Sequence, residues 1–319
     1  MTTDYHVLIL STIADVATDY VVQGLLRRGV PHHRVNTEDL PFSRSLTLEL
    51  GTEALSSLEL DGRKQPNPSS IWYRRIRSPA RPPEMQEGVY EFCLQENRAA
   101  LLGSISAYQT RWMSHPADVW RAELKPYQLQ LARRMGLRVP KTLVTNDPNA
   151  IRKAFHAFGP MIVKPSRSGY AVVDGQERSI YTSRLLAEHL EHVDEARLSP
   201  AIYQELIPKR YDIRATVVGT EVFAAAIHSQ TDPAAAVDWR HTDNPDLPHT
   251  PIQLPANVRD GVLALMSKLG LTFGAVDLVE TPDGEFVFLE VNPNGQWLWI
   301  DDQLQLGITD AIVDWLARA

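Results

Sequence analysis

A predicted β-hairpin near the C-terminus carries the residues with the clearest potential for chemistry. Its two strands would be the apolar segments GAVDLVE and EFVFLEVN, and the intervening residues TPDG are typical of a tight turn. If Glu280 faces Glu285, the antiparallel register places Asp277 opposite Phe288. Side chains two residues apart share a face of a strand, so those at even spacing beyond Phe288 are expected to point the same way as Asp277.

The polar side chains on that face are Asp277, Glu290 and Asn292, within otherwise apolar strands. Burying two carboxylates side by side costs several kcal/mol unless a positive group lies between them. A small set of hard oxygen ligands suits Mg²⁺, which completes its octahedron with waters and phosphate oxygens. A hairpin with solvated acids is the alternative, but three polar side chains on one face favour the metal. We therefore predict a Mg²⁺ site.

Lys164 ends a predicted strand, MIVKP, and is followed by the polar segment SRSGYA. Backbone N–H groups of such a loop, together with one ammonium charge, could hold a phosphate. The loop has a single glycine, Gly169, and the GxxxxGK[ST] pattern of a P-loop is absent. A solvated lysine at the end of a strand is the alternative interpretation.

The segment YQELIPKRYDIR, residues 203–214, is predicted to form a strand, a short connection and a second strand. A strand that stops at Leu206 could offer backbone groups to an adenine ring, and the carboxylate of Asp212 could bind ribose hydroxyls. Arg214 follows Asp212 by two residues and therefore shares its face of the strand. Taken alone, a charged edge strand explains this segment equally well.

Strands and helices are mixed along the whole chain, which predicts an α/β or α+β fold. No Gly-x-Gly-x-x-Gly turn follows the first predicted strand, which argues against a dinucleotide-binding domain. A helix is predicted near Ser183–His192, and the proline-rich residues 231–255 are predicted to form a long functional loop. A change of pattern at residues 114–128 suggests a domain boundary.

Length and composition exclude several classes of protein. At about 150 residues per domain, 319 residues suggest two units, and 44% apolar residues are ample for a core. The net charge of -7 argues against a dedicated nucleic-acid binder. A single cysteine, Cys93, cannot form an internal disulfide, which favours the reducing cytoplasm. No secretory signal and no apolar stretch of about 18 residues is apparent, so no membrane partner is expected.

The order of these motifs resembles that of ATP-grasp carboxylate ligases over roughly residues 115–319. The C-terminal EVNPNGQWLW, with DWR at 238–240 and WYRR at 72–75, is more specifically similar to the ribosomal-peptide macrocyclases of the microviridin, or graspetide, type. Glu-x-Asn is general to ATP-grasp enzymes, whereas NPNGQW is far more restrictive. Two departures concern the nucleotide: the loop after Lys164 is poor in glycine, and Gln204, next to Glu205, replaces the leading acid of the adenine hinge.

The resemblance implies an ATP-grasp fold of α+β subdomains after an N-terminal α/β domain of the pre-ATP-grasp kind. Residues 1–115 would form that N-terminal domain, 116–195 the central subdomain, and 196–319 the C-terminal subdomain with the metal-binding hairpin. ATP and Mg²⁺ are the implied cofactors. The resemblance assigns Lys125 and Lys164 to the phosphates, Gln204, Glu205, Leu206 and Asp212 to the nucleoside, Asp277, Glu290 and Asn292 to Mg²⁺, and Arg214 and Arg240 to catalysis.

The implied activity is ATP-dependent macrocyclisation of a ribosomal precursor peptide. Asp or Glu side chains would become acyl phosphates and then be joined to Thr or Ser as esters, or to Lys as amides. The expected partner is a peptide with a leader and an acidic core containing Thr, Ser or Lys, and the resemblance also implies a homodimer. Two alternatives stay open: a carboxylate–amine ligase for an amino acid, small peptide or protein tail, and a catalytically silent, nucleotide-dependent peptide-binding module.

Nothing in the sequence locates the leader of the peptide. Arg74, Arg75 and Arg77 are candidate peptide contacts in the N-terminal region. Solvated charges at the end of a strand explain these three arginines at least as well.

Overall fold

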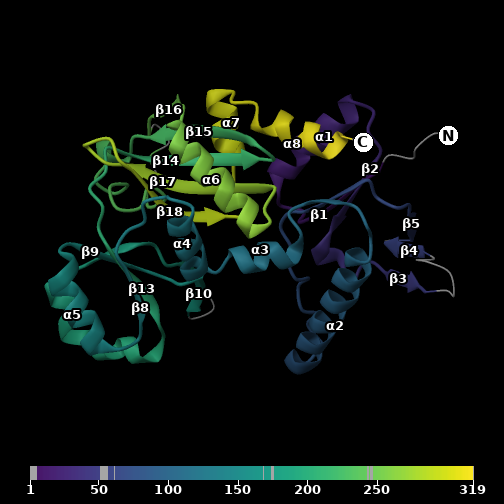
Figure 1. The fold of residues 1–319 in the computed structure, drawn as a ribbon. Helices are drawn as coiled ribbons and strands as arrows, with labels where there is room; N and C mark the ends of the chain where they lie inside the picture. The colour runs from purple at the N-terminus through teal and green to yellow at the C-terminus, as the bar shows by residue number, and fades with distance from the viewer. Residues whose placement is uncertain are drawn as a thin grey trace. The chain divides into compact units, whose positions relative to one another are not determined.

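The computed structural model describes residues 6–50, 57–60, 62–167, 169–173, 176–242, 244 and 247–318 (Figure 1). Its contacts divide the chain into two units, Met1–Pro116 with Gly307–Ala319, and Ala117–Leu306. The boundary expected after residue 115 lies next to this division. The C-terminal segment Gly307–Ala319, which the sequence assigned to the last subdomain, packs in the first unit.

The first unit contains four parallel strands, β1 (Val7–Ser11), β2 (His32–Asn36), β6 (Ser70–Tyr73) and β7 (Arg111–Met113). Their order in the sheet is β2-β1-β6-β7, and each neighbouring pair is parallel. Every residue of β1 and β6 is buried. Such continuous burial is expected of parallel strands that are covered on both faces.

Helices from both ends of the sequence complete this unit. They are α1 (Val16–Arg27), α2 (Glu87–Ser106) and α8 (Ile308–Ala317), with the 3-10 helix η1 (Thr37–Asp39) and an antiparallel sheet of β3 (Leu46–Glu49), β4 (Ser57–Leu60) and β5 (Arg63–Gln65). Helices α1 and α8 lie side by side (Figure 1). A Cβ on Gly24 would lie 2.5 Å from Val313 Cγ2, so the small residue permits this close contact.

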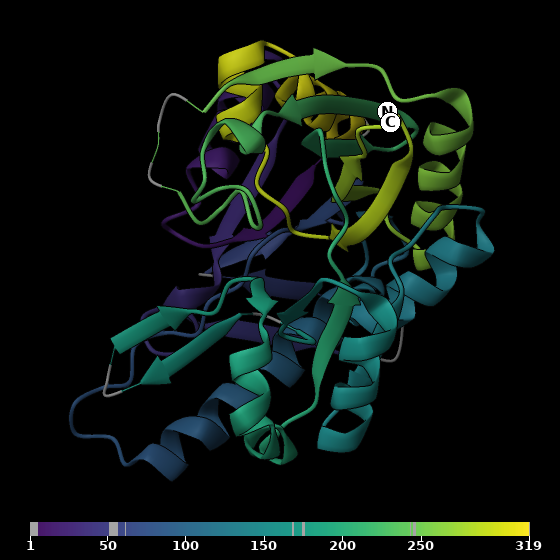
Figure 2. The same cartoon turned by 90° about the vertical axis from the view of Figure 1, so that its left-hand side faces the viewer.

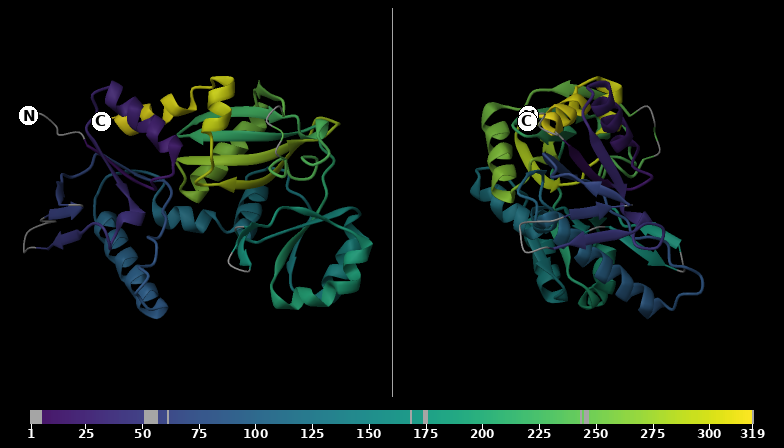
Figure 3. Two further views of the ribbon diagram at one scale, coloured as in Figure 1. Left: turned by 180° about the vertical axis from the view of Figure 1, so that it is seen from behind. Right: turned by 90° about the vertical axis from the view of Figure 1, so that its right-hand side faces the viewer.

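The second unit holds two larger antiparallel sheets and a two-stranded hairpin. The first has the order β12-β9-β13-β8, and helix α5 and the 3-10 helix η2 lie together on one face of it (Figures 1 and 3). Its elements are β8 (Thr142–Thr145), α5 (Pro148–Phe158), β9 (Met161–Lys164), β12 (Ser183–Leu185), η2 (Ala187–Leu198) and β13 (Ala201–Glu205). Asp147 caps α5 as expected, its side chain accepting a hydrogen bond from the Asn149 amide at 3.0 Å.

The second sheet of this unit has the order β16-β15-β14-β17-β18 and carries the predicted hairpin. Its strands are β14 (Tyr211–Val218), β15 (Glu221–Ile227), β16 (His249–Ile252), β17 (Phe273–Glu280) and β18 (Phe286–Asn292). The helical elements of this part are α3 (Pro116–Ala122), which begins at the division between the units, α4 (Lys125–Arg134), η3 (Ser229–Thr231), α6 (Ala256–Leu269) and α7 (Leu298–Leu304).

The mixed α/β and α+β content predicted from the sequence is confirmed, but three local predictions were wrong. Residues 183–185 form a strand instead of a helix, because they pair with β9, and η2 starts only at Ala187. The predicted loop at 231–255 includes strand β16, which pairs with β15. The loop after Lys164 contains a hairpin of β10 (Tyr170–Val173) and β11 (Gln176–Ser179), which projects from the unit in Figure 2; Ser168 in that loop lies outside the described residues.

Within the described ranges, no helix has the length and apolar character needed to cross a bilayer.

Candidate active site

The hairpin of β17 and β18 brings Asp277 and Glu290 opposite each other, in a register that differs from the prediction. Glu280 pairs with Phe286, since the turn closes with a hydrogen bond from the Thr281 amide to the Glu285 carbonyl at 2.9 Å. A β-bulge next to Asp277 then shifts the pairing by one more residue. The assumed register was therefore wrong, yet the predicted sharing of one face by the two carboxylates is confirmed, because two shifts of one residue restore the alternation.

The third predicted metal ligand, Asn292, lies on the same face but is more exposed. It pairs with Ala275, and its Oδ1 accepts a hydrogen bond from the Asn294 amide at 3.0 Å. Its role as a ligand stays a prediction. Among the described residues, no group of three or more His, Cys, Asp or Glu side chains could hold a metal ion, so a site here has two carboxylates at most.

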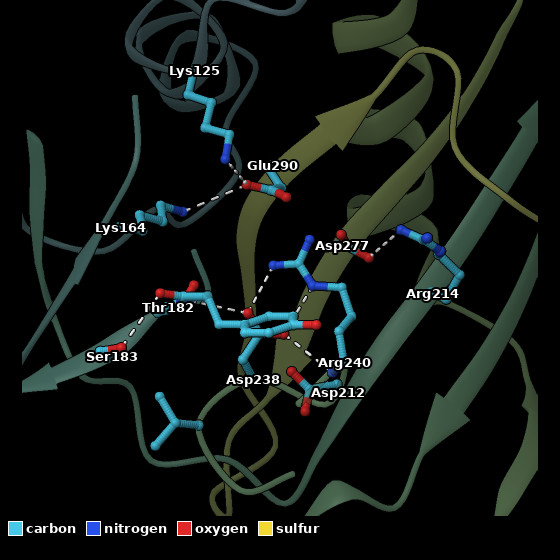
Figure 4. A network of polar contacts seen from close by, with 12 residues as sticks. Lys125, Lys164, Thr182, Ser183, Asp212, Arg214, Asp238, Arg240, Asp277 and Glu290 are labelled. Carbon is cyan, nitrogen blue, oxygen red and sulfur yellow. Dashed lines mark hydrogen bonds and ion pairs between the residues drawn. The ribbon is translucent and has the colours of Figure 1, made fainter. Parts of the chain in front are cut away.

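Two ammonium groups converge on Glu290 (Figure 4). Lys125 Nζ lies 3.1 Å and Lys164 Nζ 3.8 Å from Glu290 Oε2. Lys164 ends β9, whereas Lys125 begins α4, and Gln128 of α4 fixes that helix on β18. The Gln128 side chain accepts from the Val291 amide at 2.9 Å and donates to the Val291 carbonyl at 2.8 Å. The structure thus brings the two predicted phosphate lysines together at one carboxylate.

Burial and neighbouring charges shift the protonation of this cluster. Burial alone would raise the pKa of Glu290, but Lys164, Lys125 and Arg240 lower it to about 2, so Glu290 is ionised at neutral pH. Burial raises the pKa of Asp277, which the Arg214 guanidinium opposes and the Glu290 carboxylate reinforces. Burial lowers the pKa of Lys164, because it disfavours the charged form of the ammonium group. The cluster therefore favours a further positive charge between the carboxylates and a negative group beside the lysines.

Arg214 and Arg240 approach Asp277 from two sides (Figure 4). Arg214 is opposite Asp277 in the β14–β17 ladder, and its Nη1 donates to Asp277 Oδ1 at 2.7 Å. Arg240 is held by Asp238, whose two oxygens each accept a hydrogen bond from its guanidinium at 2.8 Å. The Asp238 hydrogen bonds, against burial, raise the pKa of Arg240 above its ordinary value. Both predicted catalytic arginines thus lie at the predicted metal carboxylates.

Asp238 also links the two sheets of the second unit. Its Oδ2 accepts a hydrogen bond from the Thr182 amide, just before β12, at 3.2 Å. Close by, the ring of Tyr181 stacks on His241 with centroids 4.9 Å apart. Sequence reasoning recorded Asp238 only as part of the DWR motif. An acid two residues before an arginine was the available signal, but its contact with Thr182 depends on the tertiary structure.

The predicted adenine hinge is held in place by protein contacts. The buried Gln204 side chain donates from Nε2 to Thr142 Oγ1 at 2.8 Å. Glu205 Oε1 accepts from the Lys141 amide at 3.0 Å. The Gln204 side chain is therefore committed to β8, and Glu205 to the segment before it.

The neighbouring Leu206 donates its amide to the Pro160 carbonyl at 2.7 Å. Asp212, the predicted ribose ligand, accepts from Lys209 Nζ at 2.9 and 2.8 Å and from Ser229 Oγ at 2.5 Å. Burial raises the pKa of Asp212, although Lys209 opposes this. Sequence reasoning missed Lys209, whose position three residues before an acid was its only signal.

One pocket, partly open to solvent, joins these groups. Its lining combines apolar side chains with charged and polar ones. Its lining includes Ile162, Lys164, Gln204, Glu205, Leu206, Ile207, Lys209, Asp212, Asp238, Trp239, Arg240, Asp277, Val279, Leu289 and Glu290. Leu289 and Glu290 are adjacent yet both line it, which the bulge explains.

The motif NPNGQW folds back over the second sheet. A Cβ on Gly295 would lie 2.2 Å from Ala275 Cβ, so only glycine fits there. The turn leads to Trp297, which is fully buried against Phe273, and then to Trp299, whose ring lies 5.1 Å from that of Trp239. Trp297 is therefore a packing residue, whereas Trp299 backs a residue of the pocket.

Matches to family models agree with this geometry. Residues 122–316 match the RimK-like ATP-grasp domain, and residues 6–119 match the MvdD pre-ATP grasp domain. The chain therefore belongs to the RimK-like ATP-grasp family, with a pre-ATP-grasp domain before it. This confirms the family and the fold class predicted from the order of the motifs.

Solved structures of three proteins are similar over almost the whole chain. A RiPP-associated ATP-grasp ligase of Chryseobacterium gregarium, solved with ADP and a leader and core peptide, has a TM-score of 0.90 and 27% identity, covering 98% of this chain and 96% of that one. The macrocyclase MdnC of Microcystis aeruginosa MRC, bound with precursor peptide MdnA, has a TM-score of 0.87 and 28% identity, covering 98% of this chain and 100% of that one. The macrocyclase MdnB of the same organism has a TM-score of 0.82 and 31% identity, covering 99% of this chain and 100% of that one.

Two curated proteins match about half of the chain. The alpha-aminoadipate–LysW ligase LysX of Sulfurisphaera tokodaii is 24% identical over 174 residues, which is 54% of this chain and 59% of that protein. The human N-acetylaspartylglutamate synthase A is 28% identical over 168 residues, covering 50% of this chain and 41% of that protein.

Proposed function

We propose that this protein is an ATP-dependent ligase that macrocyclises a ribosomal precursor peptide. The observation that carries the proposal is the pairing of Asp277 with Glu290 at one end of a pocket, with Lys125, Lys164 and Arg240 around them. The apolar residues that line the same pocket, among them Ile162, Leu206 and Leu289, suit an adenine ring, and its lysine and arginine side chains suit a polyphosphate. Similarity to ligases solved with ADP and with peptides supports the same assignment.

The donor set fits Mg²⁺. Glu290 is ionised at neutral pH and faces Asp277, and two carboxylates with one amide are typical of sites that Mg²⁺ shares with phosphate oxygens. Asp277, Glu290 and Asn292 would hold the ion, which when bound neutralises charge on the phosphates. Lys125 and Lys164, which contact Glu290 now, would then turn towards the phosphates.

The chemistry follows from the weakness of a carboxylate as an electrophile. An Asp or Glu side-chain oxygen of the peptide attacks the γ-phosphorus, the bond to the leaving ADP breaks, and an acyl phosphate results. Lys164 and Arg240 stabilise the negative charge that spreads over the transferring group. A Thr or Ser hydroxyl, or a Lys amine, then attacks the acyl carbon, phosphate leaves, and the acceptor loses a proton.

Arg214 is proposed to grip the incoming carboxylate, since a guanidinium fork matches its geometry. Asp277 holds one end of that fork, and the face of Trp239 lies 5.6 Å from Arg214 Cζ. Gln204, Glu205, Leu206 and Asp212 are proposed to bind the nucleoside, since all four line the pocket. Hydrogen bonds to Thr142 and Lys209 hold the side chains of Gln204 and Asp212 in place.

The proposed partner is a precursor peptide with a leader and an acidic core that contains Thr, Ser or Lys. The basic side chains of Lys164, Lys209 and Arg240 that line the pocket, in a chain of net charge -7, favour such a substrate. A homodimer and a cytoplasmic location complete the proposal, and a single free thiol, Cys93, fits the latter.

Intact mass spectrometry of the short peptide encoded beside this gene, incubated with the protein, ATP and Mg²⁺, tests the proposal. Successive losses of one water each, dependent on ATP, are expected, and ester-selective hydrolysis then identifies the bond. An unchanged peptide mass, together with ADP formation when a different carboxylate substrate is supplied, would refute macrocyclisation.

A carboxylate–amine ligase for an amino acid or protein tail is the second candidate. It is favoured by the matches to LysX and to N-acetylaspartylglutamate synthase A, whose names describe such joining reactions. An ADP-producing reaction with free glutamate or a related amino acid, and none with the peptide, would select it. A silent binding module is disfavoured because two facing buried carboxylates serve no purpose in binding alone.

A further inference from the structure

Strand β8 lies at an edge of the four-stranded antiparallel sheet of the second unit. The order of that sheet is β12-β9-β13-β8, so β8 pairs with β13 on one side only. An edge strand presents backbone N–H and C=O groups without ladder partners, and an extended peptide can add to such an edge as a further strand. The register with β13 determines which groups of β8 point outward.

Thr142 and Val144 direct their backbone groups to the open side of β8. The Glu205 amide donates to the Lys141 carbonyl at 3.1 Å, so in this antiparallel register residues 141, 143 and 145 bond to β13. The N–H and C=O groups of the alternate residues, Thr142 and Val144, then point away from β13. These four groups form no hydrogen bond with another described residue. They are therefore open to a strand from another chain.

A groove between β8 and helix α4 includes this open side. Thr142 and Val144 line it, together with Leu129 and Arg133 of α4. Leu143, the residue between them, packs instead in the apolar cluster that β8 shares with α5. Val144 is 40% exposed, so an apolar side chain of the strand is presented to the groove and not to the core.

Basic side chains predominate at this groove. Arg133 and Lys141 line it, and a neighbouring depression shares Arg133 and adds Arg134. Both arginines are exposed in the last turn of α4 and form no ion pair with any residue that the structure describes. Glu205 Oε2 lies 3.6 Å from Lys141 Nζ and offsets that charge, whereas Asp147, just after β8, caps α5. The two arginines therefore favour a negatively charged partner.

We propose that the groove binds an extended, acidic segment of a peptide, which adds to the sheet as a strand beside β8. Its backbone bonds to the outward groups of Thr142 and Val144, and its carboxylates pair with Arg133 and Arg134. A second copy of this chain fits less well, because pairing two β8 edges would bring the same basic side chains of both copies together. That the segment belongs to the substrate rests on the proposed function; the site itself rests on the groove alone.

Fluorescence anisotropy with a labelled octapeptide of alternating threonine and glutamate, measured without ATP, tests this site. In the full chain, Arg133→Gln removes one charge, and Val144→Pro removes an outward N–H that the ladder to β13 does not use. Val144→Thr and Arg27→Gln are the matched controls, since Arg27 is exposed on α1 in the first unit. We expect Val144→Pro and Arg133→Gln each to weaken binding about fivefold or more, and each control less than twofold.

The same peptide with all its backbone amides methylated keeps its charge but cannot donate to the edge. We expect it to bind about tenfold or more weakly than its parent. Equal binding of the two peptides would overturn strand addition, because charge attraction alone would explain it. Full binding by a folded Val144→Pro chain would also overturn it. Thermal unfolding verifies the fold of each variant, and the methylated peptide and Arg133→Gln decide the matter if Val144→Pro does not fold.

Sedimentation of the same variants tests the other occupant. A dimer that Val144→Pro converts into a monomer, with unchanged peptide binding, would assign the edge to a second copy and overturn the proposal. Peptide binding that depends on Val144 and Arg133, in a chain that produces no cyclised peptide, would refute the proposed function and leave this site intact. Cyclisation by a chain without binding at this edge would do the reverse.

Discussion

Glu290 contacts or faces several of the charged groups at the pocket. Replacing it with Gln keeps its size but removes the negative charge that faces Asp277 and contacts Lys125 and Lys164. We expect ADP release in the presence of peptide to fall by about two orders of magnitude or more, because Glu290 is proposed to hold the metal ion that neutralises charge on the phosphates. Glu285→Gln, at the exposed turn of the same hairpin, should stay near wild type. Near-normal turnover of Glu290→Gln would contradict the metal assignment.

Asp238 is expected to act through Arg240, whose guanidinium it holds. Removing its carboxylate in Asp238→Ala frees the Arg240 guanidinium and the Thr182 amide. We expect kcat to fall about tenfold or more while KM for ATP changes less than threefold, since Arg240 is proposed to act on the transition state. Asp238→Asn, which keeps one acceptor oxygen, should recover part of the loss. Asp260→Asn, on the exposed face of α6, is the control. An equal rise in the KM for ATP and the KM for the peptide would show that Asp238 only maintains the structure of the pocket.

At the scale of elements, the hairpin and the loop after it set the shape of the site. The bulge in β18 aligns two carboxylates that a regular hairpin with this turn would offset by one residue. The loop then crosses the sheet at Gly295 and brings α7, with Trp299, to the pocket. The bulge and the close approach at Gly295 are both local irregularities, and β-bulges are common next to active sites.

Gly295→Ala tests the loop. Its new Cβ would meet Ala275 Cβ at 2.2 Å, so the loop must move away from the sheet. We expect a loss of about 1–3 kcal/mol in the free energy of unfolding, measured with urea, and a further loss of activity from the displaced Trp299. Gly103→Ala in α2, where a Cβ meets no atom within 4 Å, should be neutral or stabilising. A Gly295→Ala chain as stable and active as wild type would contradict the close approach.

At the scale of the whole molecule, stability is expected to depend on two histidines of the first unit. Burial lowers the pKa of His6 and His33 below 6.5; for His33, Gln65 opposes this shift, and Arg63 and Arg44 reinforce it. The unfolded chain therefore binds more protons than the folded one near pH 6.5, so stability is full above that pH and falls as the pH drops.

Urea unfolding at pH 7.5 and 5.5 measures this effect, and a tenfold difference in proton affinity corresponds to about 1.4 kcal/mol. His33→Gln should reduce the difference between the two pH values, whereas His156→Gln, on the exposed face of α5, should leave it unchanged. The same pH dependence in His33→Gln as in wild type would show that other groups cause it.

The amino-acid sequence was enough to predict the family, the mixed fold and many of the residues that line the pocket. Turn chemistry at TPDG and alternation in the flanking strands predicted Asp277 and Glu290 on one face, but the assumed register was wrong, and the result holds because the bulge restores the alternation. The order of lysines, arginines and the NPNGQW motif was enough for the resemblance. Single motifs such as the one around Lys164 would have been ambiguous without that order.

The contacts among these groups could be seen only in the folded chain. The bulge beside Asp277, the pairing of residues 183–185 with β9, and the grip of Asp238 on both Arg240 and Thr182 join segments distant in the chain. The packing of α8 with α1 and the burial of Arg74 on Asp15 are of the same kind. Local propensity and periodicity contain no information on such contacts, because their free energy comes from neighbours that only the folded chain supplies.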